Sequence, residues 1–111
     1  MLVNIKQILG SDSALTPSSG GIIYNIIETN LSNNNRISLD FLGIEVLTSA
    51  FLNAAVGRLY YKYQSSELNS LLSIINISGD DLQLLKKVIE RAKDYFRDQK
   101  SFNDRLGEAL D

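Results

Sequence analysis

A strand, a turn and a helix follow one another in the middle of the chain, and this pattern restricts the fold more than any other. An alternating apolar strand predicted over 36–41 leads into a turn that contains Gly43. A helix is predicted over 49–64, because its apolar residues recur at the i, i+3, i+4, i+7 spacing of an amphipathic helix. This helix begins at two hydroxyl residues, Thr48 and Ser49, of the kind that cap helix N-termini. The segment is typical of an α/β domain.

The same alternation continues through the rest of the chain. Before the segment described above, the sequence predicts a strand over 2–9, a polar loop over 11–21 and a helix from about Pro17 to Asn30. After it, the sequence predicts a polar stretch over 64–70, a strand over 71–77 and a helix that starts at Ser78. Strand–helix alternation favours a mostly parallel sheet with helices packed on it. We therefore predict a small βαβαβα domain.

One domain is expected, since 111 residues cannot bury two separate cores. We assign residues 1–98 to this domain and 99–111 to a polar C-terminal tail. The charges along the last helix are expected to form a solvated face.

Composition argues against two classes of partner. The net charge is −2, so no excess of positive charge is present to neutralise a nucleic-acid backbone. The apolar runs are far shorter than the ~20 residues that span a bilayer, and the N-terminus lacks the pattern of a signal peptide. We expect a cytoplasmic protein that binds neither nucleic acid nor membrane.

The absence of two residue types limits the chemistry. The chain has no Cys and no His. Thiolate nucleophiles, disulfides, cysteine zinc sites and the most common general base at neutral pH are therefore excluded. Asp80 and Asp81 lack further ligands at metal-loop spacing and are expected to cap a helix. We predict no catalytic residue, no metal site and no cofactor, and hence a protein that is not an enzyme.

The segment 39–51 resembles the signature of STAS domains, which occur in sulphate transporters and anti-sigma-factor antagonists. In that signature a strand ends in Asp, a turn with Gly and an apolar residue follows, and Asp-Ser-Ser-Gly opens a helix. The matching positions of the strand and turn are Asp40, Gly43 and Ile44. At the helix start, Ser49 falls on the position of the phosphorylated Ser, and Ala50 falls on that of the second small residue. Thr48 occupies the position of the Asp, and Phe51 occupies that of the Gly.

The Thr-x-x-Phe form is closer to a poorly characterised STAS-like family of small bacterial and mobile-element proteins. This family shares the pattern seen here at 74–78, followed by an amphipathic helix. The resemblance covers roughly residues 3–97 and implies a STAS-like fold. Classical members bind an ATP-binding kinase-like protein through this turn and helix, and phosphorylation of the Ser breaks the complex. A phosphate adds about −1.5 to −2 of charge to such an interface.

Seven residues are predicted to form a partner-binding or switch surface: Asp40, Gly43, Thr48, Ser49, Phe51, Tyr60 and Tyr61. A structural role is the alternative for several of them. Asp40 could instead cap the N–H groups of the next turn, Thr48 and Ser49 could simply cap the helix, and Phe51 could belong to the core. The run 60–63 cannot be wholly buried on one helix, so we expect Tyr60 or Tyr61 to be exposed.

The function that follows is a regulatory interaction module that binds a protein through the strand–turn–helix at 40–52. The partner suggested by the resemblance is an ATP-binding kinase-like protein, and homodimer formation is open. One alternative is a small-molecule or nucleotide-binding protein or enzyme that uses the helix start at Gly20 and Gly21, although close packing also explains these glycines. Another is a mobile-element inhibitor of a host protein.

Overall fold

The computed structural model describes the backbone of residues 1–110 and the side chains of residues 1–95. Three parallel strands form the main sheet in the order β1-β3-β5, namely β1 (Leu2–Asn4), β3 (Ile37–Asp40) and β5 (Leu72–Ile75). A separate two-stranded parallel sheet, here called the mini-sheet, pairs β2 (Ser13–Ala14) with β4 (Val46–Leu47). The predicted α/β fold with a parallel sheet is confirmed.

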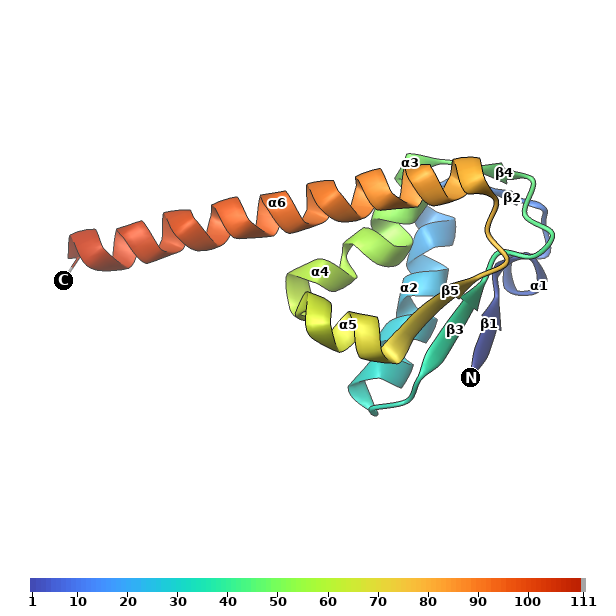
Figure 1. Ribbon diagram of the computed structural model, residues 1–111, viewed down its shortest axis with the longest axis horizontal. Coiled ribbons are helices and arrows are strands. Elements are labelled where there is room, and N and C mark those ends of the chain that lie inside the picture. Colours follow the sequence, from blue (N-terminus) through green and yellow to red (C-terminus); the bar gives the residue numbers. More distant parts are fainter. Residues whose placement is uncertain (111) are drawn as a thin grey trace.

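Helices are packed beside the sheet and over one end of the domain (Figure 1). They are α1 (Ile5–Leu9), α2 (Pro17–Ser32), α3 (Ser49–Leu52), the π-helix η1 (Asn53–Gly57), α4 (Leu59–Lys62), α5 (Ser65–Leu71) and α6 (Gly79–Leu110). Helix α2 contacts β3 on one side and the α3–η1 segment on the other, and α6 contacts α3, η1 and α4. The segment 49–62 therefore lies between α2 and α6.

The core forms where the sheet meets α2. Val3 and Leu39 are paired on neighbouring strands and are fully buried. From α2, Ile23, Ile27 and Leu31 recur every four residues on one face and are buried as well. This spacing presents a continuous apolar stripe to the sheet, as expected for a surface helix of an α/β domain.

The predicted strand over 2–9 is wrong in its second half, which forms α1. The side-chain oxygen of Asn4 accepts a hydrogen bond from Gln7 N (2.8 Å) and so caps the helix. Gly10 ends the helix with φ 66°, a left-handed conformation that glycine adopts at low cost. The N-cap and the glycine C-cap determine the conformation of residues 5–9 more strongly than the partial alternation of apolar and polar residues does.

Two other segments differ from the prediction. The polar stretch 64–70 contains α5, whose N-terminus is capped because Gln64 N donates to the Glu67 carboxylate (3.3 Å). The polar loop 11–21 contains β2, which pairs with β4 after the turn.

The C-terminal helix is longer than predicted. Its backbone is helical to Leu110, so most of the predicted tail continues α6, and residue 111 lies outside the described residues. Figure 1 shows α6 crossing one end of the domain and extending past the other elements. None of the helices within the described residues is both long enough and apolar enough to cross a membrane.

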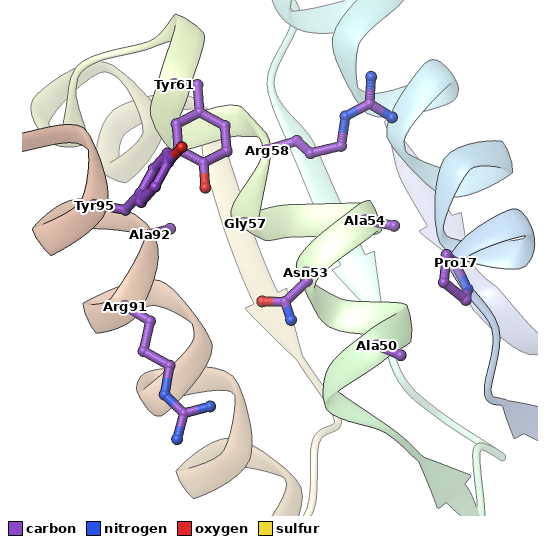
Figure 2. Close-up of a pocket in the computed structure, with 10 residues that line it drawn as sticks. All are labelled: Pro17, Ala50, Asn53, Ala54, Gly57, Arg58, Tyr61, Arg91, Ala92 and Tyr95. Atoms are coloured by element: carbon purple, nitrogen blue, oxygen red, sulfur yellow. The ribbon is translucent and has the colours of Figure 1, made fainter. Parts of the chain in front are cut away.

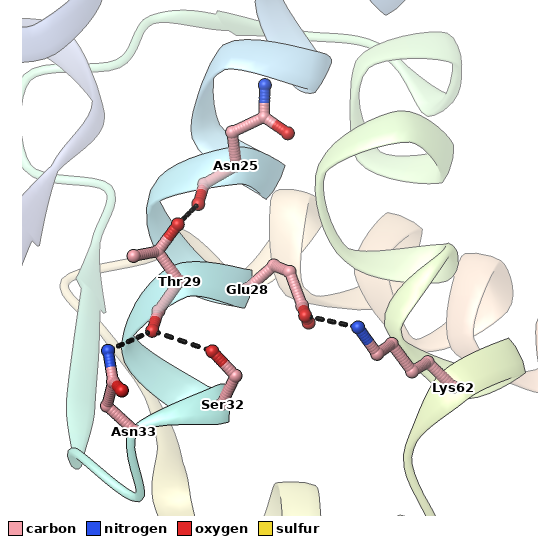
Figure 3. Close-up of polar contacts among 6 residues, drawn as sticks. All are labelled: Asn25, Glu28, Thr29, Ser32, Asn33 and Lys62. Carbon is pink, nitrogen blue, oxygen red and sulfur yellow. Dashed lines mark hydrogen bonds and ion pairs between the residues drawn. The ribbon is translucent and has the colours of Figure 1, made fainter.

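The C-terminal end of α2 is held by side chains that bond its own backbone (Figure 3). Asn33 and Ser32 both donate to the Thr29 carbonyl, and the Thr29 hydroxyl donates to Asn25 O. One turn away, Glu28 forms an ion pair with Lys62, which links α2 to α4. Desolvation opposes ionisation of Glu28, but Lys62 and the Tyr63 hydroxyl together lower the pKa of this carboxyl.

Gly20 allows α2 to approach α3 and η1 at backbone distance. A Cβ at this position would lie 2.5 Å from Phe51 O and 2.7 Å from the Ala54 Cβ. At Gly21 a Cβ would meet nothing within 4 Å. Of the two explanations for these glycines, close packing is thus confirmed for Gly20.

The two glycines therefore predict opposite effects on stability. Gly20→Ala should lower the free energy of unfolding by about 1–3 kcal/mol, because the backbone of Phe51 must move to admit the methyl group. Gly21→Ala should raise it by up to about 1 kcal/mol, because alanine is the better helix former. Urea unfolding followed by circular dichroism measures both, and equal effects of the two variants would contradict this packing.

Candidate functional site

Asp40 joins the carboxyl ends of the three strands of the main sheet. Its Oδ2 accepts a hydrogen bond from Asn4 Nδ2 (3.0 Å), and its Oδ1 accepts from Asn76 Nδ2 (2.9 Å) and from Leu42 N (3.0 Å). Asn4 ends β1 and Asn76 directly follows β5, so the carboxylate bridges both neighbours of β3. Only 5 % of Asp40 is exposed.

These hydrogen bonds determine the charge state of Asp40. The bonds from the Asn76 and Asn4 amides and from the Leu42 N–H lower the pKa of the carboxyl below its ordinary value, against the opposing effect of burial. All three donors favour the ionised form. The carboxylate is therefore engaged within the molecule, and the predicted role of Asp40 on a partner surface is wrong, whereas its predicted alternative as a cap on the next turn is confirmed.

Thr48 is also engaged internally. Its Oγ1 accepts from Phe51 N (3.2 Å), which caps α3, and donates to Leu15 O (2.6 Å) across the mini-sheet. The capping role anticipated for Thr48 is confirmed. Ser49, the first residue of α3, is half-buried, and its hydroxyl makes no hydrogen bond with any other described residue.

The outward side of this region is partly apolar. Side chains alternate across a strand, so the register Ser13↔Val46 places Ser13 and Leu15 on the same side of the mini-sheet as Val46 and Thr48. Leu15 is 43 % and Val46 50 % exposed. We call these four residues together with the adjoining Ser49 the turn surface.

Beside the turn surface lies a groove over α3 and η1, between the start of α2 and α6 (Figure 2). Its volume is about 610 Å³, and we call it the helix groove. The lining residues are Pro17, Ala50, Asn53, Ala54, Gly57, Arg58, Tyr61, Arg91, Ala92 and Tyr95. The groove adjoins the turn surface because Ala50 follows Ser49 and Pro17 lies two residues after Leu15.

A π-turn shapes the floor of this groove. Arg58 N donates to Asn53 O (3.1 Å), a bond that spans five residues in place of four. Such single π-turns inside α-helices are frequent at functional sites. The extra residue shifts the helix face, so the one helix predicted over 49–64 consists of three pieces with different orientations of their side chains.

The other predicted site residues divide between core and surface. Phe51 is fully buried and Tyr60 is 8 % exposed, so the prediction that they contact a partner is wrong for both. They lie on the inner face of the segment 49–62, which packs into the core. Tyr61 is 46 % exposed, as expected for one of the two tyrosines, and lines the helix groove. Gly43 is exposed and has φ 87°, which its turn requires.

A family model described as a STAS-like domain of unknown function (DUF4325) matches residues 19–82. This chain belongs to that family. The match extends from the first turns of α2 to the first turn of α6 and includes the turn, α3, η1 and β5. The resemblance and the fold predicted from the sequence are thereby confirmed. No curated protein and no solved structure matched the chain.

Sequence reasoning missed several residues of this STAS-like domain that matter to its site. Asn4 and Asn76 escaped notice, although each stands at the carboxyl end of a parallel strand, where such ends share one edge of the sheet. Asn76 has φ 56°, a left-handed conformation that Asn tolerates better than most residues. Arg58 and Arg91 line the same groove only because α6 packs against η1, a contact that no local pattern reveals.

The described residues contain no group of three His, Cys, Asp or Glu positioned to hold a metal ion. On the turn surface the polar groups are two serines and a threonine, whereas Asp40, at the end of β3, is already bonded three times. The hydroxyls of Ser13 and Thr48 are bonded within the molecule, so Ser49 and the apolar side chains Leu15 and Val46 are the groups of this surface left without internal hydrogen bonds among the described residues.

Replacing the Asp40 carboxylate should uncouple the strand ends. In Asp40→Asn an amide N–H group must face one of the three donors, so we expect a loss of about 1–3 kcal/mol of unfolding free energy at neutral pH. Because the folded pKa of Asp40 is lowered, its contribution is present above the ordinary carboxyl value of 3.8 and is lost as pH falls through the folded pKa.

The wild type should therefore lose more stability than Asp40→Asn between neutral pH and about pH 3. Urea unfolding at a series of pH values measures the difference. Glu45→Gln, a matched change at an exposed carboxylate in the same turn, should keep the stability and the acid dependence of the wild type. Identical pH profiles for Asp40→Asn and the wild type would contradict the role of the network.

Proposed function

We propose that this STAS-like domain is a non-enzymatic regulatory module that binds a partner protein through the turn surface. The observation that carries the proposal is the pair of exposed apolar side chains, Leu15 and Val46, on the outward face of a hydrogen-bonded mini-sheet beside Ser49. Exposed apolar residues on a rigid element favour association, because full burial of a Val or Leu side chain contributes about 1.5–3 kcal/mol.

Internal hydrogen bonds support the geometry of this surface. Thr48 bonds both α3 and the Leu15 carbonyl, so the two apolar side chains are held next to the helix start. Glu45 N and Val46 N both donate to Asp12 O, which fixes β4 against β2. Little conformational entropy remains to be lost when a partner binds such a preorganised surface, and affinity increases accordingly.

Ser49 is the position where binding could be regulated. Its hydroxyl makes no hydrogen bond with the described residues, unlike that of Thr48, so a modification would break no hydrogen bond among them. A phosphate or an introduced carboxylate would place negative charge among apolar contacts, where desolvation opposes complex formation. The resemblance to classical STAS domains favours an ATP-binding kinase-like protein as the partner. An inhibitor of a host protein would use the same surface.

Packing at Gly20 argues against a role of this glycine in a nucleotide cradle at the start of α2. The position where a Cβ would stand faces the backbone of Phe51. A phosphate-binding glycine leaves its backbone open to the ligand.

The proposal predicts the loss of partner binding in two variants. Val46→Asp and Ser49→Asp should each weaken the affinity for a purified ATP-binding kinase-like protein by at least about tenfold, because each buries an unpaired charge in the interface. Isothermal titration calorimetry measures the dissociation constants.

Ser66→Asp serves as the matched control, since Ser66 is exposed on α5 and is not part of the turn surface. This control should bind as the wild type does. Wild-type affinity in both Val46→Asp and Ser49→Asp would show that a partner binds elsewhere and would refute the proposal.

A further inference from the structure

We propose that the helix groove binds an acidic peptide segment of a partner protein. The inference rests on the proposed function in taking the chain to be an interaction module, and it adds a second surface with its own ligand chemistry. Two arginines and two tyrosines surround a floor of small side chains in this groove.

The shape of the groove fits a chain segment. The floor of the groove, on α3 and η1, carries small residues, namely Ala50, Ala54 and Gly57. Pro17 flanks one side of the groove and α6 flanks the other (Figure 2). The groove is open along its length, whereas sites for small molecules usually enclose most of their ligand. Its volume of about 610 Å³ is sufficient for several side chains.

The charge of the groove is opposite to that of the whole chain. Arg58 and Arg91 line it, and among the side chains described, those of residues 1–95, no acidic one lines it, although the chain has a net charge of −2. Within the side chains that the structure describes, the sole ion pair joins Lys62 to Glu28, so neither arginine has a carboxylate partner among them. Figure 2 shows that the two guanidinium groups extend on opposite sides of the groove.

The arginines are suited to carboxylates in particular. A guanidinium group presents a planar fork of N–H donors that matches a carboxylate in a bidentate arrangement. Arg58 is already ordered, because its guanidinium carbon lies 4.0 Å from the centre of the Tyr24 ring. Less side-chain entropy is therefore lost when this group binds a ligand.

Aromatic side chains form one end of the groove. The rings of Tyr61 and Tyr95 pack edge to face with their centroids 5.6 Å apart, and both residues are about half exposed. Tyr and Arg, together with Trp, are enriched among the residues that contribute most to binding at protein interfaces. Together they favour a segment in which acidic residues alternate with apolar or aromatic ones.

A fluorescence anisotropy titration of the full chain tests this inference. The probe is a labelled peptide in which glutamate alternates with leucine and tyrosine, and the comparison peptides carry glutamine or lysine in place of glutamate. The acidic peptide should bind saturably, and the other two should bind at least about tenfold more weakly. High salt should weaken binding of the acidic peptide.

Three variants distinguish the groove from general electrostatics. Arg91→Glu should weaken binding of the acidic peptide by at least about tenfold, whereas Lys86→Glu, an equal charge change at an exposed position of α6 outside the groove, should change it by less than about twofold. Ala50→Leu should also weaken binding, because it fills the floor without a change in charge. Circular dichroism confirms that each variant is folded.

The inference is overturned if the acidic peptide does not bind saturably, if the lysine peptide binds as well as the acidic one, or if Arg91→Glu and Lys86→Glu have equal effects. None of these outcomes bears on the turn surface, which is tested with Val46→Asp and Ser49→Asp and a purified partner. Conversely, a partner whose binding ignores Ser49 but is lost in Arg91→Glu would refute the proposed turn surface and support the groove.

Discussion

The buried carboxylate of Asp40 is the interaction on which the rest of the domain depends. The three parallel strands are only three or four residues long and therefore share few backbone hydrogen bonds. Asp40 joins these ends through the Asn4 and Asn76 side chains, and it also fixes the next turn by accepting from Leu42 N. Asn4 in turn caps α1, so a single charged group organises one whole edge of the sheet. That organisation determines where the chain leaves β3 for the mini-sheet.

The second constraint is the close contact between α2 and the segment 49–62. Gly20 lets the two helices approach at backbone distance, and the π-turn at η1 redirects the side chains that follow. As a result Tyr60 turns into the core and Tyr61 faces outward beside α6. The turn surface and the helix groove lie next to each other because of this packing.

Local signals in the sequence are sufficient to predict the fold class, most elements and the cap at Thr48. Each of these features produces a strong pattern within a few neighbouring residues. The start of α2 at Pro17 and of α6 after Ser78 are examples. The short helices α1 and α5 were missed, since five to seven residues carry too little periodicity to outweigh a polar or alternating pattern. For Asp40, the cap on the next turn could be predicted, but its bonds to Asn4 and Asn76 could not. Each of these partners is 36 residues away and is brought to Asp40 only by the register of the strands.

The central claim is that the polar residues of the strand–turn–helix segment support the fold from within, while the outward faces beside them bind a partner. Amide chemical-shift mapping of the full chain during titration with a purified ATP-binding kinase-like protein tests it most directly. The account predicts the largest shifts at 13–17, at 46–61 and along the part of α6 that lines the groove, with the Asn4–Asp40–Asn76 network unperturbed. Shifts concentrated on the open edges of the main sheet or around α1, with none at Val46 or Ser49, would contradict it.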